Sequence, residues 1–350
     1  MFRKTKFTLL QGVIISSVGV LLVLSNFILR SISPSIFPNY YIYIVIALAL
    51  FLFLLKVDFE IFETFSLHLY VLTISLLIIT LALGQVTRGA IRWIPVGSLT
   101  LQPSEIFRPF ILLYLAKYAT EKEIDLRRFL KLCILFSVPF ALILIQPSLG
   151  VALVTGVGFL GVIFASTIEK KVLLLGILFF VLVIPFSWFL MAPYQKDRIV
   201  TFLNPYRDPQ GSGYNSIQST ISVGSGRIFG RGLGQGVQTQ LAFLPEKHTD
   251  FIFAATAEEL GFLGAGLILL AFFCFFMSFI KIIENPTNIC ARAYVASSFL
   301  VFLAQTTIHV GMNMGLVPIT GLPLPFVSAG GSALLGSFLS LGIALKVRKD

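Results

Sequence analysis

The segment from Leu244 to Asp250 reads Leu-Pro-Glu-Lys-His-Thr-Asp and leads directly into an apolar stretch that starts at Phe251. Asp250 therefore carries a carboxylate at the border between a polar loop and an apolar helix, with His248 two residues before it. A carboxylate with an apolar wall on one side binds a proton more readily than a solvated one, which suits a general base. We take Asp250 as the candidate base or metal ligand, with capping of the next helix as the alternative role.

Two further carboxylates, Glu258 and Glu259, follow inside the apolar stretch. A continuous helix rises 1.5 Å per residue, so these side chains would lie roughly 12 to 14 Å beyond Asp250. Charged groups at such a depth need partners and commonly serve substrate binding or transport. We predict that Glu258 and Glu259 belong to a substrate-binding region.

A second polar segment precedes another apolar stretch and contains Arg92, Trp93, Glu105 and Arg108. The indole of Trp93 suits the headgroup boundary of a membrane. Glu105 and Arg108 are three residues apart, so on one helix they share a face and neutralise each other. Such a pair either supports chemistry in a polar cavity or is a buried ion pair that only fixes helix packing.

The longest polar segment, residues 193–250, is net basic and rich in glycine. Arg198 and Arg207 offer planar guanidinium groups that bind phosphate oxygens in pairs, as an anionic lipid headgroup or a pyrophosphate requires. The alternative is a solvated loop that touches acidic lipids nonspecifically. Its length is well beyond that of an ordinary connection, so we expect a functional element or short interfacial helices within it.

The elements that position these segments must cross a membrane. The chain of 350 residues is 57% hydrophobic and 12% charged and contains 35 Phe, which excludes an ordinary soluble protein. The sequence predicts an all-α polytopic membrane protein with about ten spans, one long extracytoplasmic loop and a single domain over residues 1–350. The predicted spans lie near 9–29, 40–56, 66–84, 104–118, 129–147, 149–167, 171–192, 251–280, 290–312 and 326–346.

The charge pattern orients these spans. Most Lys and Arg of the short connections fall on one face, and an even number of spans returns the chain to its starting side, so both termini are expected in the cytoplasm. The first span is interpreted as a retained helix because it is too long for a signal peptide. The same bias explains the net charge of +10 without a nucleic-acid partner. The three Cys lack metal-ligand spacing and indicate neither zinc nor disulfides.

Several blocks of the chain together resemble the SEDS family of shape, elongation, division and sporulation proteins. These blocks occur in the family's order and are Arg92-Trp93-Ile94, Gln102-Pro103-Ser104-Glu105, Leu244 to Phe251, Glu258-Glu259-Leu260-Gly261 and Thr320 to Phe326. The stretch Asp208 to Tyr214, with Gln218-Ser219, is more similar to the rod-shape branch of the family than to its division branch.

The resemblance implies a function and partners. It implies a peptidoglycan glycosyltransferase that polymerises lipid II at the outer face of the bacterial cytoplasmic membrane, with a class B penicillin-binding protein and other elongation-complex membrane proteins as partners. Apart from the resemblance, the departing pyrophosphate makes a divalent cation, Mg²⁺ or Mn²⁺, a candidate cofactor. Polymerisation needs a base near the attacking sugar hydroxyl and cations near the departing pyrophosphate.

The resemblance also assigns roles to residues. It implies that Asp250 is required for polymerisation, and we add Glu105 and Arg108 as its support in the cavity. The expected substrate contacts are Arg92, Trp93, Arg198, Arg207, Gln218, Ser219, His248, Glu258 and Glu259.

Three positions depart from the family's usual pattern, and two other functions stay open. Arg108, Ser148 and Ala329 stand where the family usually has Lys, Asp and Tyr, which suggests a divergent or inactive member. A lipid II flippase would use the charges within the membrane as a headgroup path. A noncatalytic scaffold would only recruit a penicillin-binding protein.

Overall fold

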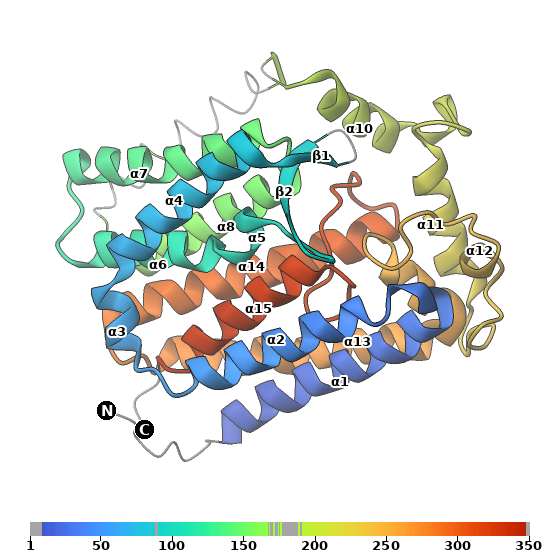
Figure 1. The fold of residues 1–350 in the computed structure, drawn as a ribbon, viewed down its shortest axis with the longest axis horizontal. Coiled ribbons are helices and arrows are strands. Elements are labelled where there is room, and N and C mark those ends of the chain that lie inside the picture. Colours follow the sequence, from blue (N-terminus) through green and yellow to red (C-terminus); the bar gives the residue numbers. More distant parts are fainter. Residues whose placement is uncertain are drawn as a thin grey trace.

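The computed structural model describes residues 9–87, 90–166 and 191–347, with a few single positions between 167 and 190. Long helices lie side by side in a bundle, with a small sheet and several short helices at one end (Figure 1). Within the described residues, five helices are long and apolar enough to cross a membrane: α1 (Leu9–Ile32), α4 (Ser66–Leu83), α7 (Leu126–Ile145), α13 (Ile252–Glu284) and α14 (Ile289–Asn313). Shorter apolar helices are α2 (Asn39–Leu54), α8 (Leu149–Ala165) and α15 (Gly331–Ala344).

Nine of the ten predicted spans overlap helices of the structure. The predicted span 171–192 lies largely outside the described residues, so the number of membrane crossings stays a prediction. The predicted span 104–118 is divided: α5 (Pro103–Ile106) ends at Phe107, whose φ of −98° and ψ of 2° are not helical, and α6 (Arg108–Thr120) continues from there. The other α-helices of the described residues are α3 (Phe59–Thr64), α10 (Pro193–Leu203), α11 (Tyr214–Ser225) and α12 (Val237–Gln240), and two short 3-10 helices cover Pro34–Ile36 and Pro205–Arg207.

The beginning of α1 and the end of α15 lie at the same end of the bundle (Figure 1). Gln11 Nε2 donates a hydrogen bond of 3.1 Å to the carbonyl of Leu345, although 334 residues separate them. The long polar segment and its helices α10 to α12 lie at the opposite end. This arrangement agrees with an even number of spans, while the assignment of the two ends to cytoplasm and exterior stays a prediction.

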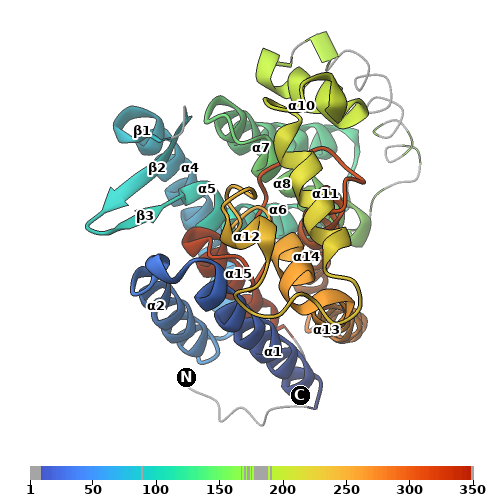
Figure 2. The same ribbon diagram turned by 90° about the vertical axis from the view of Figure 1, so that its right-hand side faces the viewer.

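Three short strands between residues 85 and 101 form an antiparallel sheet that was not predicted from the sequence. The strands are β1 (Gln85–Thr87), β2 (Ala90–Val96) and β3 (Leu99–Leu101), and they lie to one side of α11 and α12 (Figure 2). Gly97 has a φ of 61° in the two-residue turn between β2 and β3, a conformation that glycine adopts without strain. The sheet carries Arg92 and Trp93, so the all-α prediction holds only for the bundle.

Aromatic rings fill the core where α13, α14 and α15 meet. The ring of Phe326 lies 5.8 Å from that of Phe275, 5.6 Å from Phe302 and 5.3 Å from Phe338, measured between ring centres. Phe326 belongs to residues 314–330, the segment that joins α14 to α15, which we call the connecting segment. The φ of Phe326 is 61°, which is unusual for a bulky residue, and the surrounding rings hold Phe326 in this conformation. The core therefore fixes the connecting segment beside the start of α13.

Helix α13 is broken at Gly261, whose φ is 68° and ψ is −162°. Residues 226–232 of the long polar segment lie against this break, and we call them the clasp loop. Four main-chain hydrogen bonds join the residues on the two sides of the break to the clasp loop. They run from Arg231 N to Glu258 O (2.9 Å), Gly232 N to Glu259 O (3.0 Å), Phe262 N to Arg227 O (2.8 Å) and Leu263 N to Ile228 O (3.2 Å).

Candidate active site

Asp250 lies directly before α13 and is held from the end of α14. Asn313 Nδ2 donates to the main-chain carbonyl of Asp250 at 3.0 Å and to that of His309 at 2.8 Å. Asn313 Oδ1 accepts the main-chain N–H of Ala254, in the first turn of α13, at 2.9 Å. Because Asn313 is fully buried, these three bonds fix the main chain at Asp250. This role of Asn313 was not predicted from the sequence.

The connecting segment lines the other side of Asp250. Ser328 Oγ donates to the carbonyl of Thr249 at 2.7 Å, and the N–H of Ala329 donates to that of His248 at 2.9 Å. A Cβ at Gly321 would lie 3.4 Å from Asp250 Oδ2, and the φ of this glycine is +70°. The carboxylate therefore borders a bare stretch of main chain, where a substrate can approach closely.

Glu105, Arg108, Arg92 and Asp250 form one electrostatic cluster. The charge of Arg108 acts most strongly on Glu105, followed by the charges of Arg92 and Asp250. Glu105 and Arg108 are both buried. Their helix is broken at Phe107, so they do not share a helical face, and Arg108 Nη2 donates to Gln305 Oε1 at 3.3 Å. The charges of Glu105 and Arg108 thus interact although the two residues lie on different helices, and Gln305 is an additional partner of Arg108.

Glu258 and Glu259 are already occupied by hydrogen-bond donors of the protein. Glu258 accepts the main-chain N–H groups of Gln238 (2.8 Å) and Thr239 (3.0 Å) in α12. Glu259 accepts from Ser31 Oγ at 2.5 Å, Gln240 Nε2 at 2.8 Å and Thr239 Oγ1 at 3.3 Å. These contacts hold α12 and the end of α1 against α13, so both carboxylates take part in helix packing.

The other predicted substrate contacts are dispersed around the site. Arg92 lies with its guanidinium carbon 5.8 Å from the ring centre of Trp93. Arg198 Nη1 donates to the carbonyl of Ile319 at 3.1 Å, so it reaches the connecting segment near Gly321. Ser219 is buried and donates to the carbonyl of Asn313 at 2.9 Å.

Arg207, Gln218 and His248 show three different environments. Arg207 is exposed in the turn after α10, and Gln218 is half-buried on α11. His248 Nε2 lies 4.0 Å from Glu246 Oε2, close enough for a weak ion pair when the ring is protonated. Only His248 of these three adjoins Asp250 along the chain.

Lys247 is a half-buried cation near the site that the sequence analysis did not assign. Its Nζ donates a hydrogen bond to the carbonyl of Thr239. Burial lowers the pKa of the Lys247 ammonium from its usual range, and the charges of Glu259 and Glu258 partly oppose this effect. Lys247 therefore connects the acidic pair to the segment that carries Asp250.

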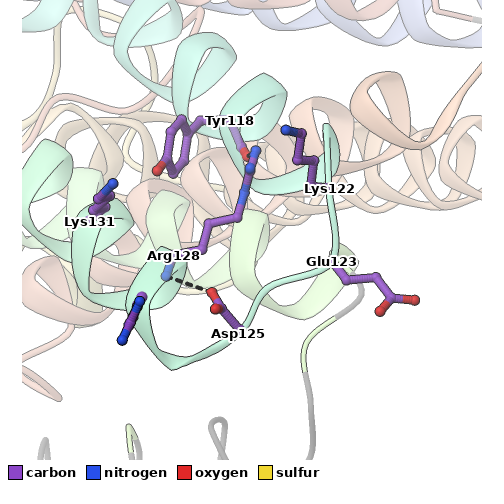
Figure 3. A pocket seen from close by; sticks show the side chains of 7 residues that line it. Tyr118, Lys122, Glu123, Asp125, Arg128 and Lys131 are labelled. Atoms are coloured by element: carbon purple, nitrogen blue, oxygen red, sulfur yellow. Dashed lines mark hydrogen bonds between the residues drawn. The ribbon is translucent and has the colours of Figure 1, made fainter.

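Two surface cavities lie at the opposite end of the bundle. One has a volume of about 330 Å³ and is lined by Tyr118, Lys122, Glu123, Asp125, Arg127, Arg128 and Lys131 (Figure 3). The other, of about 500 Å³, includes Lys117, Asn288 and Cys290. Their position agrees with a basic cytoplasmic face and separates them from Asp250.

The described residues contain no group of three or more His, Cys, Asp or Glu side chains that could hold a metal ion. A protein cage for a cation is therefore absent from this part of the chain. A cation held by one carboxylate together with phosphates of a substrate remains compatible with Asp250.

The family model of the cell cycle proteins FtsW, RodA and SpoVE matches residues 5–350. The chain belongs to this family. It is 34% identical to the peptidoglycan glycosyltransferase MrdB of Escherichia coli K12, over 82% of this chain and 79% of MrdB. It is 37% identical to the stage V sporulation protein E of Bacillus subtilis, over 84% and 82% of the two chains.

Solved structures of this family have the same fold. A chain from a peptidoglycan synthase complex, described as coordinating polymerization and crosslinking, superposes with a TM-score of 0.80 at 29% identity, covering 96% of both chains. The rod shape determining protein RodA of Thermus thermophilus superposes with a TM-score of 0.69 at 25% identity, covering 96% of this chain and 95% of RodA. Like its relatives, this FtsW/RodA/SpoVE family member is a multi-pass protein of the bacterial cytoplasmic membrane.

The three positions where this family member departs from the usual pattern are all accommodated. Arg108 contacts Gln305, and the N–H of Ala329 holds the main chain of His248. Ser148 Oγ lies 3.4 Å from Gln102 Nε2, which also donates to Ser104 Oγ at 3.2 Å. Arg108 and Ser148 thus have side-chain partners, whereas the bond at position 329 is made by the main chain and does not depend on the alanine side chain.

Proposed function

We propose that this protein is a peptidoglycan glycosyltransferase that polymerises lipid II at the outer face of the cytoplasmic membrane during cell elongation and rod-shape maintenance. The observation that carries the proposal is the position of Asp250. Its main chain is fixed by Asn313, and its carboxylate borders the bare main chain at Gly321. The names of its relatives, which include peptidoglycan glycosyltransferases, support the same activity.

In the proposed reaction, a sugar hydroxyl of one substrate attacks the anomeric carbon of the other. The new C–O bond forms as the bond to undecaprenyl pyrophosphate breaks, and the proton of the hydroxyl passes to the Asp250 carboxylate. A positioned base of this kind contributes roughly 10²- to 10⁴-fold to the rate. The main-chain clamp on Asp250 serves this step because proton transfer requires the base within hydrogen-bonding distance.

Arginine side chains would stabilise the departing pyrophosphate. Arg92 belongs to the same electrostatic cluster as Asp250, and Arg198 already reaches the connecting segment beside Gly321. Guanidinium groups bind phosphate oxygens in pairs, and their charge opposes the negative charge that develops on the leaving group. Glu105 and Arg108 would support this cluster from the buried side, while the exposed Arg207 would meet the substrate only from the loop.

In the alternative role of Asp250 as a metal ligand, its carboxylate would hold a divalent cation, Mg²⁺ or Mn²⁺, together with the pyrophosphate. The cation would supply charge neutralisation at the leaving group. The partner is proposed to be a class B penicillin-binding protein, alongside other membrane proteins of the elongation complex. The likeness to a chain of a peptidoglycan synthase complex supports an assembly of this kind.

The test uses the full-length protein with its penicillin-binding partner, lipid II and Mg²⁺ or Mn²⁺, and measures glycan ladders on gels. We expect the wild type to make ladders and Asp250→Asn to lose them, by at least about 10²-fold in rate. Asp197→Asn is the matched control, because Asp197 is an exposed carboxylate in α10 of the same loop. This control should polymerise at the wild-type rate.

The other outcomes separate the alternative functions. Ladders of equal intensity from Asp250→Asn would remove the proposed base. A wild-type protein that makes no ladders but moves labelled lipid II across vesicles would be a flippase. One that only binds its penicillin-binding partner would be a scaffold.

A further inference from the structure

The break at Gly261 divides α13 into a short part and a long part. The length of the long part locates the membrane boundary at this end of the bundle. The whole helix has 33 residues and would measure about 50 Å if it were straight. The part after the break, residues 262–284, measures about 34 Å and matches the ~30 Å hydrocarbon layer. The break at Gly261 therefore lies near the boundary of the hydrocarbon at the end of the bundle that carries the long polar segment, which is the predicted outer side.

Helix α1 independently places the boundary at the same level. Its 24 residues span about 36 Å, again close to the thickness of the hydrocarbon. Ser31, at its end, donates to Glu259 just before the break and accepts the N–H of Gly234 at 2.7 Å. Two neighbouring spans thus end at the height of the clasp loop.

The clasp loop exposes large apolar side chains at this height. Ile228 and Phe229 are 59% and 79% exposed, and they lie beside Phe262 and Leu263, which are 71% and 56% exposed. The main-chain bonds from Phe262 to Arg227 and from Leu263 to Ile228 hold the two pairs together. The apolar edge of the clasp loop therefore continues the lipid-facing surface of α13.

Two cations flank this apolar edge. Arg227 and Arg231 are exposed, and their guanidinium groups form no ion pair with any residue that the structure describes. Arginine beside an apolar pair is the arrangement by which interfacial segments contact the phosphates and the upper acyl chains of lipids. Burying the break in lipid is permitted because the clasp loop satisfies the broken main-chain hydrogen bonds.

We propose that the clasp loop is embedded in the outer leaflet, with Ile228 and Phe229 among the acyl chains and Arg227 and Arg231 at the phosphates of the lipids. The bound partner is an ordinary phospholipid of the surrounding bilayer. The inference does not depend on the catalytic activity. Its consequence is that the segment leading to Asp250 is attached to the surface on which a lipid-linked substrate would move.

The test places a tryptophan at three positions in the full-length protein, reconstituted in nanodiscs of phosphatidylcholine and phosphatidylglycerol with brominated acyl chains. The native signal of Trp93 and Trp188 is subtracted by comparison with the wild type. Phe229→Trp and Phe262→Trp should add blue-shifted emission that bromine quenches. Gln210→Trp, in the exposed turn before α11, should add emission that bromine does not quench.

Each result decides the proposal. Quenching at Phe229→Trp that matches Phe262→Trp supports embedding in the leaflet. Unquenched emission at Phe229→Trp, like that of Gln210→Trp, overturns the embedding and indicates that the apolar edge contacts a protein partner. Unquenched emission at Phe262→Trp also overturns the embedding, because the membrane boundary would then lie below the break. In the Phe229→Trp protein, Arg227→Glu with Arg231→Glu should reduce the quenching, and unchanged quenching would remove the proposed phosphate contacts.

Discussion

The side-chain amide of Asn313 fixes the main chain at the candidate base, Asp250. The Asn313 side chain makes three hydrogen bonds, which join the end of α14 to Asp250 and to the first turn of α13. Its own carbonyl accepts from Ser219 on α11. Because a buried group that loses its hydrogen-bond partner costs about 1 to 3 kcal/mol, the site has few other ways to arrange this main chain.

We expect Asn313→Leu to lower the turnover of lipid II roughly tenfold. A misplaced base stabilises the transition state less, and a loss of about 1.4 kcal/mol of that stabilisation lowers a rate tenfold. The apparent KM should change little, because no substrate contact is removed. Asn288→Leu is the control. Asn288 caps the other end of α14, so this change should lower stability by about 1 kcal/mol and leave turnover per folded molecule intact. Equal turnover in the two variants would argue against the positioning role.

Asp250 could be proposed as a candidate from the sequence and Asn313 could not, for a physical reason. A carboxylate at the start of an apolar run is conspicuous because of its local surroundings. The role of Asn313 arises from a contact across 63 residues, and the only local signal is an amide at the end of an apolar helix. Glu258 and Glu259 differ from Asp250 in this respect. Their charges are evident in the sequence, but their hydrogen-bond partners in α12 and α1 could not be predicted from it.

At the scale of elements, the break in α13 and the clasp loop form one unit. Gly261 and Gly230 both have positive φ, and a Cβ on Gly261 would lie 2.2 Å from the main-chain nitrogen of Gly230. No side chain fits there, so glycine at the break is required by both conformation and space.

Gly261→Ala should therefore lower stability by about 1 to 3 kcal/mol from backbone strain alone, with the main-chain clash in addition. Gly266→Ala is the matched control on the same helix, because a Cβ there meets nothing within 4 Å. It should be neutral or stabilising by about 0.5 to 1 kcal/mol. Thermal unfolding in detergent, followed by the loss of monodisperse protein on size exclusion, compares the two. Similar midpoints for both variants would contradict the proposed role of the break.

Apolar runs predicted most of the helices because burial in lipid requires long, uninterrupted hydrophobic stretches. The same runs concealed the break at Gly261, since a glycine within an apolar run does not reveal its φ. They also concealed the break at Phe107, which separates Glu105 from Arg108. The sheet over residues 85–101 was missed because its short strands form by pairing with one another, and polar loops were expected there.

At the scale of the whole molecule, the two ends of the described chain meet at one end of the bundle, through Gln11 and Leu345. We expect fluorescent-protein fusions at either terminus to fluoresce, because such proteins fold in the cytoplasm. An alkaline phosphatase inserted after Gln210 should be active, because that enzyme matures outside. Activity of the phosphatase at a terminus, with none after Gln210, would invert the predicted orientation.

The contacts of the connecting segment also set the order in which the protein can be completed during synthesis. Ser328 and Ala329 hold the main chain of Thr249 and His248, and Gly321 borders the carboxylate of Asp250. A ribosome makes these residues 71 to 79 positions after the aspartate, when the helices from α1 to α14 have already been synthesised. A nascent chain can therefore have its helices up to α14 in place while the surroundings of Asp250 are still incomplete, and the site is complete only once the connecting segment before α15 has been made.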